Sequence, residues 1–232
     1  MRMNRFSLSV AYAATTLACG IANSQPVTVD AGHTVLTLPP GLRAYSAPMT
    51  RQFTGGDPIR IDRQVVLLSL GGRAPEAAML VESTREAGRY IWTDSCKQFH
   101  NNAHTFVYSP FHAMANECTV AVGPIDLASV IGESFADVEQ TLRAGGQSVP
   151  TGVGYVVRST YASWGGSMLS ATVFVREPLA RLSTAPETMP DDTGVPTSVV
   201  AWARALNDQV RGAMLSISGA WQLPPLNGKN ED

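Results

Sequence analysis

Residues 152–176 read GVGYVVRSTYASWGGSMLSATVFVR, and this stretch decides the fold class. In its first half, residues 152–162, valine and tyrosine alternate with smaller or polar neighbours, which is typical of a strand with one buried face. A second run of the same character occupies residues 167–176, and Trp-Gly-Gly at 164–166 supplies a turn between the two. The stretch therefore predicts a β-hairpin, and a hairpin implies an antiparallel sheet.

Other short apolar or alternating runs that end at glycine, proline or polar turn residues predict further strands. These runs are residues 27–38, 65–70, 78–83, 89–93, 104–108 and 118–122. We expect the third and fourth of them to pair as a hairpin. Residues 46–64 are rich in Gly, Pro, Asp and Arg, and this composition predicts a loop.

Two amphipathic helices are predicted. In residues 134–144, Ser134 and Asp137 fit a capping box, and Phe135, Val138 and Leu142 share one face. A longer helix is predicted over residues 198–218, where apolar residues recur at steps of three and four. Its apolar positions are Val199, Trp202, Ala203, Leu206, Val210, Ala213, Met214 and Ile217, and its polar positions are Arg204, Asn207, Asp208 and Arg211.

Amphipathic helices must bury their apolar stripes, and the predicted sheet is the surface available to them. We therefore expect a single α+β domain over residues 25–226, with a mainly antiparallel sheet covered by the mid-chain helix and the long C-terminal helix. Residues 227–232 form a polar tail. An opening strand that ends in Leu38-Pro39-Pro40-Gly41, a meander and a long closing helix resembles the Mog1/PsbP-like sandwich. No residue role or activity is carried over from that resemblance.

The N-terminus has the parts of a secretory signal. Arg2 and Arg5 precede the uncharged residues 6–22, and Ala22 and Ser24 place small side chains where signal peptidase cleaves. Residues 1–24 are therefore predicted to be removed, and the protein to be periplasmic or secreted by a bacterium. One alternative is an uncleaved membrane anchor. Another is a lipid anchor, because residues 16–19, ending in Cys19, resemble a lipobox.

Removal of the signal would leave two cysteines, Cys96 and Cys118. An even count in an oxidising compartment favours a disulfide between them. The same region suggests a metal site as an alternative, because Cys96, His100 and His104 are spaced four residues apart and His112 follows. Thiolate and imidazole groups bind zinc or copper, so His100, His104 and His112 are the candidate ligands.

Motifs for catalysis are missing from the sequence. It has no Gly-x-Ser-x-Gly elbow, no Ser-x-x-Lys set, no His-Glu-x-x-His and no phosphate-binding glycine loop. A hydrolase whose Ser, His and Asp are dispersed along the chain stays open as an alternative. The net charge of −2, without basic clusters, disfavours nucleic acid as a partner.

The preferred prediction is an exported, non-catalytic binding or accessory module of the cell envelope. It uses no cofactor, and its partner is an envelope protein or a small ligand. No segment after the signal is long and apolar enough to cross a bilayer.

Overall fold

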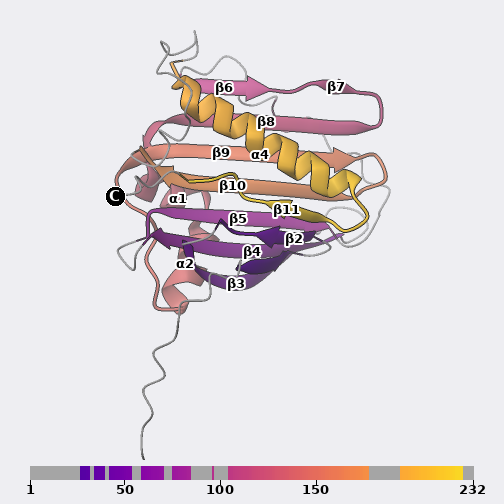
Figure 1. Ribbon diagram of the computed structural model, residues 1–232. Helices are drawn as coiled ribbons and strands as arrows, with labels where there is room; N and C mark the ends of the chain where they lie inside the picture. Colours follow the sequence, from indigo (N-terminus) through magenta and orange to yellow (C-terminus); the bar gives the residue numbers. More distant parts are fainter. Residues whose placement is uncertain are drawn as a thin grey trace, which may run out of the picture.

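A computed structural model describes residues 27–31, 34–39, 42–53, 59–70, 75–84, 96, 104–177 and 194–226. Its main sheet has eight strands in the order β3-β4-β5-β10-β9-β8-β6, with β7 also paired to β8 (Figure 1). The strands are β3 (Leu42–Phe53), β4 (Ile59–Leu70), β5 (Ala77–Thr84), β6 (Thr105–Tyr108), β7 (Phe111–His112), β8 (Ala115–Asp126), β9 (Val153–Ser163) and β10 (Met168–Arg176). All of its pairings are antiparallel, which confirms the predicted fold class.

A small second sheet joins the two ends of the described chain. It contains β1 (Thr28–Ala31), β2 (Thr34–Thr37) and β11 (Ala220–Gln222), and β11 pairs with β2 in parallel. Its inward side chains, among them Leu36 and Trp221, belong to the same apolar core as the inner face of the C-terminal helix.

Helices cover both faces of the main sheet. Helix α4 (Thr197–Leu215) crosses β8, β9 and β10 on one face. The paired helices α1 (Leu127–Ser134) and α2 (Ala136–Ala144) lie on the opposite face, behind the sheet in Figure 1. None of the described helices is both long and apolar enough to span a membrane.

Strand β5 shows how the sheet separates two cores. Met79 and Val81 point into the core under α4, whereas Ala78 and Leu80 point into the core under α1 and α2. Successive side chains of a strand point to opposite faces, so a strand covered on both sides must be apolar throughout. This explains the unbroken apolar runs in β4 and β5.

The hairpin predicted from residues 152–176 is confirmed as β9 and β10. The loop predicted for residues 46–64 is wrong, because most of it belongs to the β3–β4 hairpin, in which both strands have twelve residues. Strand β3 lies at the edge of the sheet, where the missing amide of Pro48 is tolerated.

The expected pairing of residues 78–83 with 89–93 is also wrong, because β4 and β10 occupy both edges of β5. Residues 89–93 lie outside the described chain.

The mid-chain helix is two helices. Residue Ser134 ends α1 instead of capping α2, whose N-cap is Phe135 with no side-chain hydrogen bond. The capping box is therefore wrong, and the cap in this region is Asp126, whose carboxylate accepts from the Ala128 amide at 3.0 Å. The predicted apolar face of α2 is confirmed, since Val138 and Leu142 are fully buried.

The apolar stripe of α4 is confirmed from Val199 to Ala213, where six of the predicted residues are buried. Two predictions for this helix are wrong. Ile217 lies beyond the end of the helix and is fully exposed, and Asn207, expected on the polar side, is buried. The buried amide of Asn207 has partners on the sheet, which a helical repeat in the sequence does not reveal.

Candidate functional site

A polar row crosses the sheet on the face covered by α1 and α2. The strand registers place six residues next to one another in the order Met49, Arg63, Glu82, Ser170, Thr160 and Cys118. Cross-strand partners in a sheet point to the same face and lie about 5 Å apart, so their side chains interact directly. The row brings together residues from six strands and connects Arg63 at one side of the sheet with the cysteine at the other.

Arg63 is the charged centre of this row. Its side chain is only 5% exposed, its Nε donates to Glu82 Oε1 at 2.8 Å, and its Nη1 donates to Asp137 Oδ2. The buried guanidinium is thus partnered by one acid from β5 and one from α2. A buried charge is tolerated when it is paired and hydrogen-bonded, and this pairing also attaches α2 to the sheet.

The contact with Arg63 helps to lower the pKa of the Asp137 carboxyl group. Burial is the largest influence and by itself raises the pKa of Asp137. The hydrogen bond and positive charge of Arg63, together with the backbone amide of Val138, outweigh burial and hold the pKa below its ordinary value. Asp137 is therefore ionised across the neutral pH range.

A hollow of about 710 Å³ lies between the polar row and the paired helices. Its charged lining residues are Arg63, Glu82, Glu133, Asp137 and Arg158, and its apolar walls include Met49, Leu80 and Phe135. A concave site with apolar walls and a few convergent charged groups is the usual form of a small-molecule site. We therefore take this hollow as the candidate functional site.

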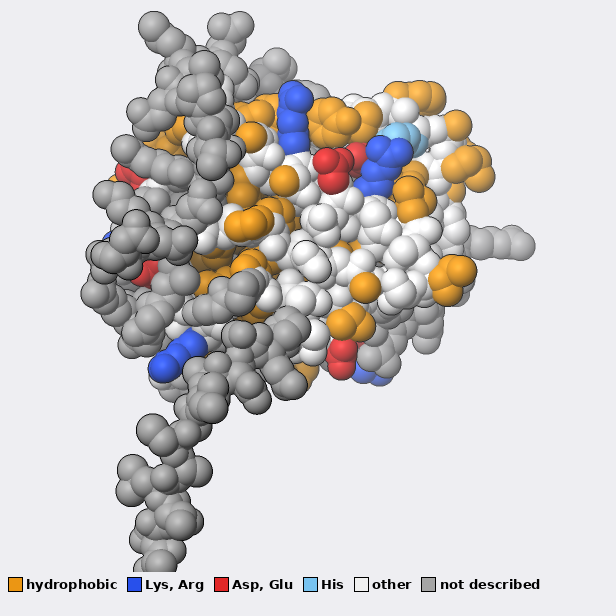
Figure 2. Space-filling view, viewed as in Figure 1, with side chains coloured by type: hydrophobic (Ala, Val, Ile, Leu, Met, Phe, Trp, Pro, Cys, Tyr) orange, Lys and Arg blue, Asp and Glu red, His pale blue; other side chains and the backbone are white. Residues whose placement is uncertain are grey.

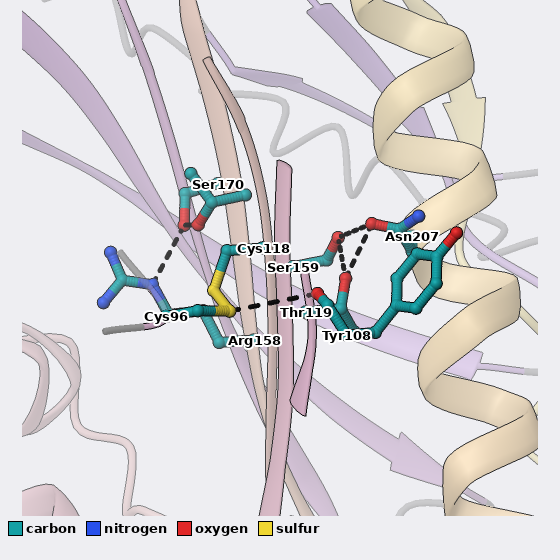
Figure 3. The surroundings of a disulfide bond; sticks show 9 residues. Cys96, Tyr108, Cys118, Thr119, Arg158, Ser159, Ser170 and Asn207 are labelled. Carbon is teal, nitrogen blue, oxygen red and sulfur yellow. Dashed lines mark hydrogen bonds between the residues drawn. A yellow bond between two sulfur atoms is a disulfide. The ribbon is translucent and has the colours of Figure 1, made fainter. Parts of the chain in front are cut away.

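Two arginines of the described chain line the hollow, and Arg158 has fewer hydrogen-bond partners there than Arg63. Arg158 lies on β9 and is half-buried, and its Nε donates to Ser170 Oγ at 3.3 Å. Ser170 in turn shares a hydrogen bond with Thr160 at 2.9 Å. Figure 3 shows the contact between Arg158 and Ser170. No acid of the described residues forms an ion pair with Arg158. Within the described chain, the other guanidinium nitrogens of Arg158 therefore have no acidic partner.

Cys96 and Cys118 form the predicted disulfide, with an S–S distance of 2.01 Å and Cα atoms 5.5 Å apart. Both cysteines are buried, and they lie on the same face of the sheet as Arg158 and Ser170 (Figure 3). Because both sulfur atoms are in the bridge, neither can be a thiolate ligand of a metal.

Two of the three histidines of the proposed metal site, His104 and His112, lie far from each other. His100 lies outside the described residues. The carbonyl of His104 accepts from the Gly123 amide at one end of β8, whereas His112 pairs with Ala115 at the other end, so the two are roughly 25 Å apart along the strand. Within the described ranges no group of three or more His, Cys, Asp or Glu residues is placed to hold a metal ion.

A second polar cluster lies on the opposite face, under α4. Its centre is Glu117, whose side chain is fully buried. Glu117 Oε2 lies 2.5 Å from His112 Nε2, and Glu117 Oε1 accepts from Asn207 Nδ2 at 2.5 Å. The Nε of Arg211 approaches the same carboxyl group at 3.9 Å. These contacts hold α4 against β8 and account for the buried carboxyl group.

The Asn207 side chain completes the cluster. Its Oδ1 accepts from Thr119 Oγ1 at 2.6 Å and lies 3.2 Å from Ser159 Oγ (Figure 3). Both polar ends of the amide are thereby satisfied, so this cluster is internally complete and structural. Within the part of the chain that is described, neither His104 nor His112 is hydrogen-bonded to a serine, threonine or cysteine side chain.

The sequence did not reveal the charged residues of the hollow. Arg63 fell inside the stretch assigned to a loop, yet Ile61, Arg63, Val65 and Leu67 alternate along β4 and lie on one face. This period of two is the signal that extends the predicted strand at residues 65–70 towards the N-terminus. The partner acids come from distant segments, and only the sheet register and the position of α2 bring them together.

Comparison with known proteins returned no relative: no protein-family model, curated protein or solved structure matches this chain. The likeness to the Mog1/PsbP-like sandwich therefore rests on the order of elements and on the short motif at residues 38–41 alone.

Proposed function

We propose that this protein is a non-catalytic binding module of the bacterial cell envelope and that the hollow between the sheet and α1–α2 holds its ligand. The observation that carries the proposal concerns Arg158, a half-buried residue that lines a hollow of about 710 Å³ and whose guanidinium has no acidic partner among the described residues. Unpaired charge in a recessed site favours an external partner of opposite sign.

The lining of the hollow indicates the chemistry of that ligand. Arg63 is already neutralised by Glu82 and Asp137, so among the described lining residues Arg158 is the cation without an acidic partner. A guanidinium binds a carboxylate or phosphate through paired hydrogen bonds. Met49 and Phe135, which are partly exposed, offer apolar surface to the rest of the ligand, and Glu133 is an exposed acid beside them. The proposed ligand is a small molecule with one acidic group and a neutral or cationic remainder.

The compartment is part of the proposal. Disulfides persist mainly outside the reducing cytosol, so the Cys96–Cys118 bond supports an exported protein. The predicted signal, residues 1–24, and the alternative lipid attachment at Cys19 both lie outside the described residues. Intact mass spectrometry of the exported protein would report cleavage after Ser24, lipid on Cys19 and the two hydrogens lost in the bridge.

A binding experiment tests the site. The exported protein would be screened by ligand-observed NMR against amino acids, dipeptides, dicarboxylates and sugar phosphates. We expect at least one of these compounds to bind, and Arg158→Gln to weaken that binding by at least about tenfold, since a charge-assisted bidentate contact is lost. Arg176→Gln is the matched control, because Arg176 is a partly buried strand arginine that does not line the hollow. Equal weakening by both variants, or no binding by any compound, would contradict the proposal.

A further inference from the structure

Large apolar side chains protrude at one end of the main sheet. Seven large hydrophobic residues are exposed in the described chain, and five of them belong to three segments at this end. We call these five residues the apolar tips: Phe111 (93% exposed), Met114 (68%), Trp164 (52%), Leu215 (64%) and Ile217 (109%). Exposed apolar area of this extent on a monomer commonly marks a site of interaction with a partner or a membrane.

The fold places these three segments together. The Trp164 amide donates to the Met114 carbonyl at 3.0 Å, which joins the β9–β10 turn to the β7–β8 turn. Helix α4 runs towards the same end, because Asn207 lies over Thr119 and Arg211, one turn later, reaches Glu117. The end of α4 and the two turns therefore share one edge of the molecule, on the right in Figure 1.

The three segments carry no charged side chain. Residues 109–116, 162–168 and 212–222 contain no Asp, Glu, Lys or Arg. Their polar residues are Ser, Asn and Gln, together with His112, whose Nε2 lies 2.5 Å from Glu117 Oε2. In the space-filling view, hydrophobic side chains line this edge beyond the charged surface of α4 (Figure 2). Three apolar segments without a charged side chain match a surface that excludes charged groups.

The shape of the edge favours a lipid surface over a folded partner. Phe111 and Ile217 stand almost free of the protein, and they come from separate segments. A protein partner would need a matched pocket for each protruding side chain, whereas the boundary of a bilayer accepts them independently. Tryptophan is moreover favoured at that boundary, because its ring is apolar and its N–H is polar.

We infer that the apolar tips insert into the surface of a phospholipid bilayer and hold the protein there peripherally. Without basic residues in the three segments, the attraction comes from apolar burial and not from anionic headgroups. Binding should therefore occur on neutral lipid and change little with salt, unlike binding through a basic patch.

Sedimentation with phosphatidylcholine vesicles tests the inference. We expect the exported full-length protein to sediment with the vesicles at low and at high salt. The double variant Phe111→Ser/Trp164→Ser should partition at least about tenfold less, since two apolar side chains are removed from the contact. Val153→Ser is the matched control: Val153 is 52% exposed but lies at the opposite end of β9. The wild type, the double variant and the Val153→Ser control all have the same N-terminus. Any contribution of the N-terminal segment to vesicle binding is therefore equal in the three proteins.

Trp164 also provides a direct reading of insertion. The chain has four tryptophans, of which Trp202 and Trp221 are buried and Trp92 lies outside the described residues. Because Trp92 is present in both proteins, a blue shift of tryptophan fluorescence on vesicle addition that disappears in Trp164→Phe reports this tip. The phenylalanine variant should still sediment with the vesicles. The inference fails if the wild type stays in the supernatant, or if the double serine variant sediments as well as the control does. It also fails if the tips instead mediate a dimer, seen by light scattering and lost in the double serine variant, without vesicle binding.

Discussion

Arg63 and Glu82 lie directly opposite each other on β4 and β5, and Arg63 Nε donates to Glu82 Oε1 at 2.8 Å. The Arg63 and Glu82 side chains are 5% and 14% exposed, so water solvates them little. Each charge is therefore stabilised mainly by the other. Asp137, the third member, is half exposed and reaches Arg63 from α2. The floor of the hollow is therefore a charge network built on the sheet and closed by a helix.

Removal of Arg63 by itself should be costly. Arg63→Met leaves Glu82 buried without its partner, and we expect a loss of about 3 kcal/mol in the free energy of unfolding. Arg63→Met/Glu82→Leu removes both buried charges and should recover most of that loss, because well-packed apolar residues replace an ion pair at little cost. Urea denaturation of the two variants measures both values. A double variant no more stable than the single one would show that Glu82 is not the source of the penalty.

Acid should weaken the attachment of α2. The pKa of Asp137 is lower in the folded chain than in the unfolded chain, where an aspartate titrates near 3.9. Its contribution to stability is therefore complete above that unfolded pKa and is lost as the pH falls through the lowered folded pKa. Asp137→Asn should make unfolding free energy less dependent on pH below about pH 4.5. Because Asp137 is half exposed, the effect at neutral pH should not exceed about 1 kcal/mol.

Measurement of urea unfolding at a series of pH values gives this dependence. Asp208→Asn serves as the control, because Asp208 is exposed and lies on α4, over the other face of the sheet. An acid dependence that is the same in Asp137→Asn and in the wild type would exclude the Arg63 contact as its cause.

Asn207 should be more important for stability than its helical position suggests. Asn207→Ala removes the donor to Glu117 and the acceptor for Thr119, which leaves buried polar groups unsatisfied. Such a loss costs about 2–3 kcal/mol. Asp208→Ala, at the next position of α4 and exposed, should change stability by less than about 0.5 kcal/mol. Thermal unfolding followed by circular dichroism compares the two, and equal effects would contradict the role assigned to Asn207.

The disulfide should stabilise the protein by closing a loop in the unfolded chain. Cys96 and Cys118 are 22 positions apart, and a loop of this length corresponds to roughly 3 kcal/mol. Cys96→Ala/Cys118→Ala should therefore unfold at lower denaturant concentration than the wild type. A reducing agent should lower the stability of the wild type towards that of the variant and leave the variant unchanged. A wild type insensitive to reductant, with its thiols shown to be free, would contradict this contribution.

Most of the fold could be predicted from local patterns. The alternation in residues 152–162 defines a strand, and the stripe from Val199 to Ala213 defines the helix that covers it, because each pattern repeats with the period of its own element. The cysteine pair could be predicted too, since removal of residues 1–24 leaves an even number of sulfur atoms.

The charged hollow, the buried Asn207 and the apolar tips were decided by tertiary structure. Arg63 meets Asp137 only because the register of β4 and the position of α2 bring residues 74 positions apart into contact. Trp164 and Met114 meet only because two turns end at the same edge of the sheet. A sequence pattern reports the face on which a side chain lies within its own strand or helix. The residue opposite that side chain depends on strand register and helix placement, which are set by burial across the whole chain.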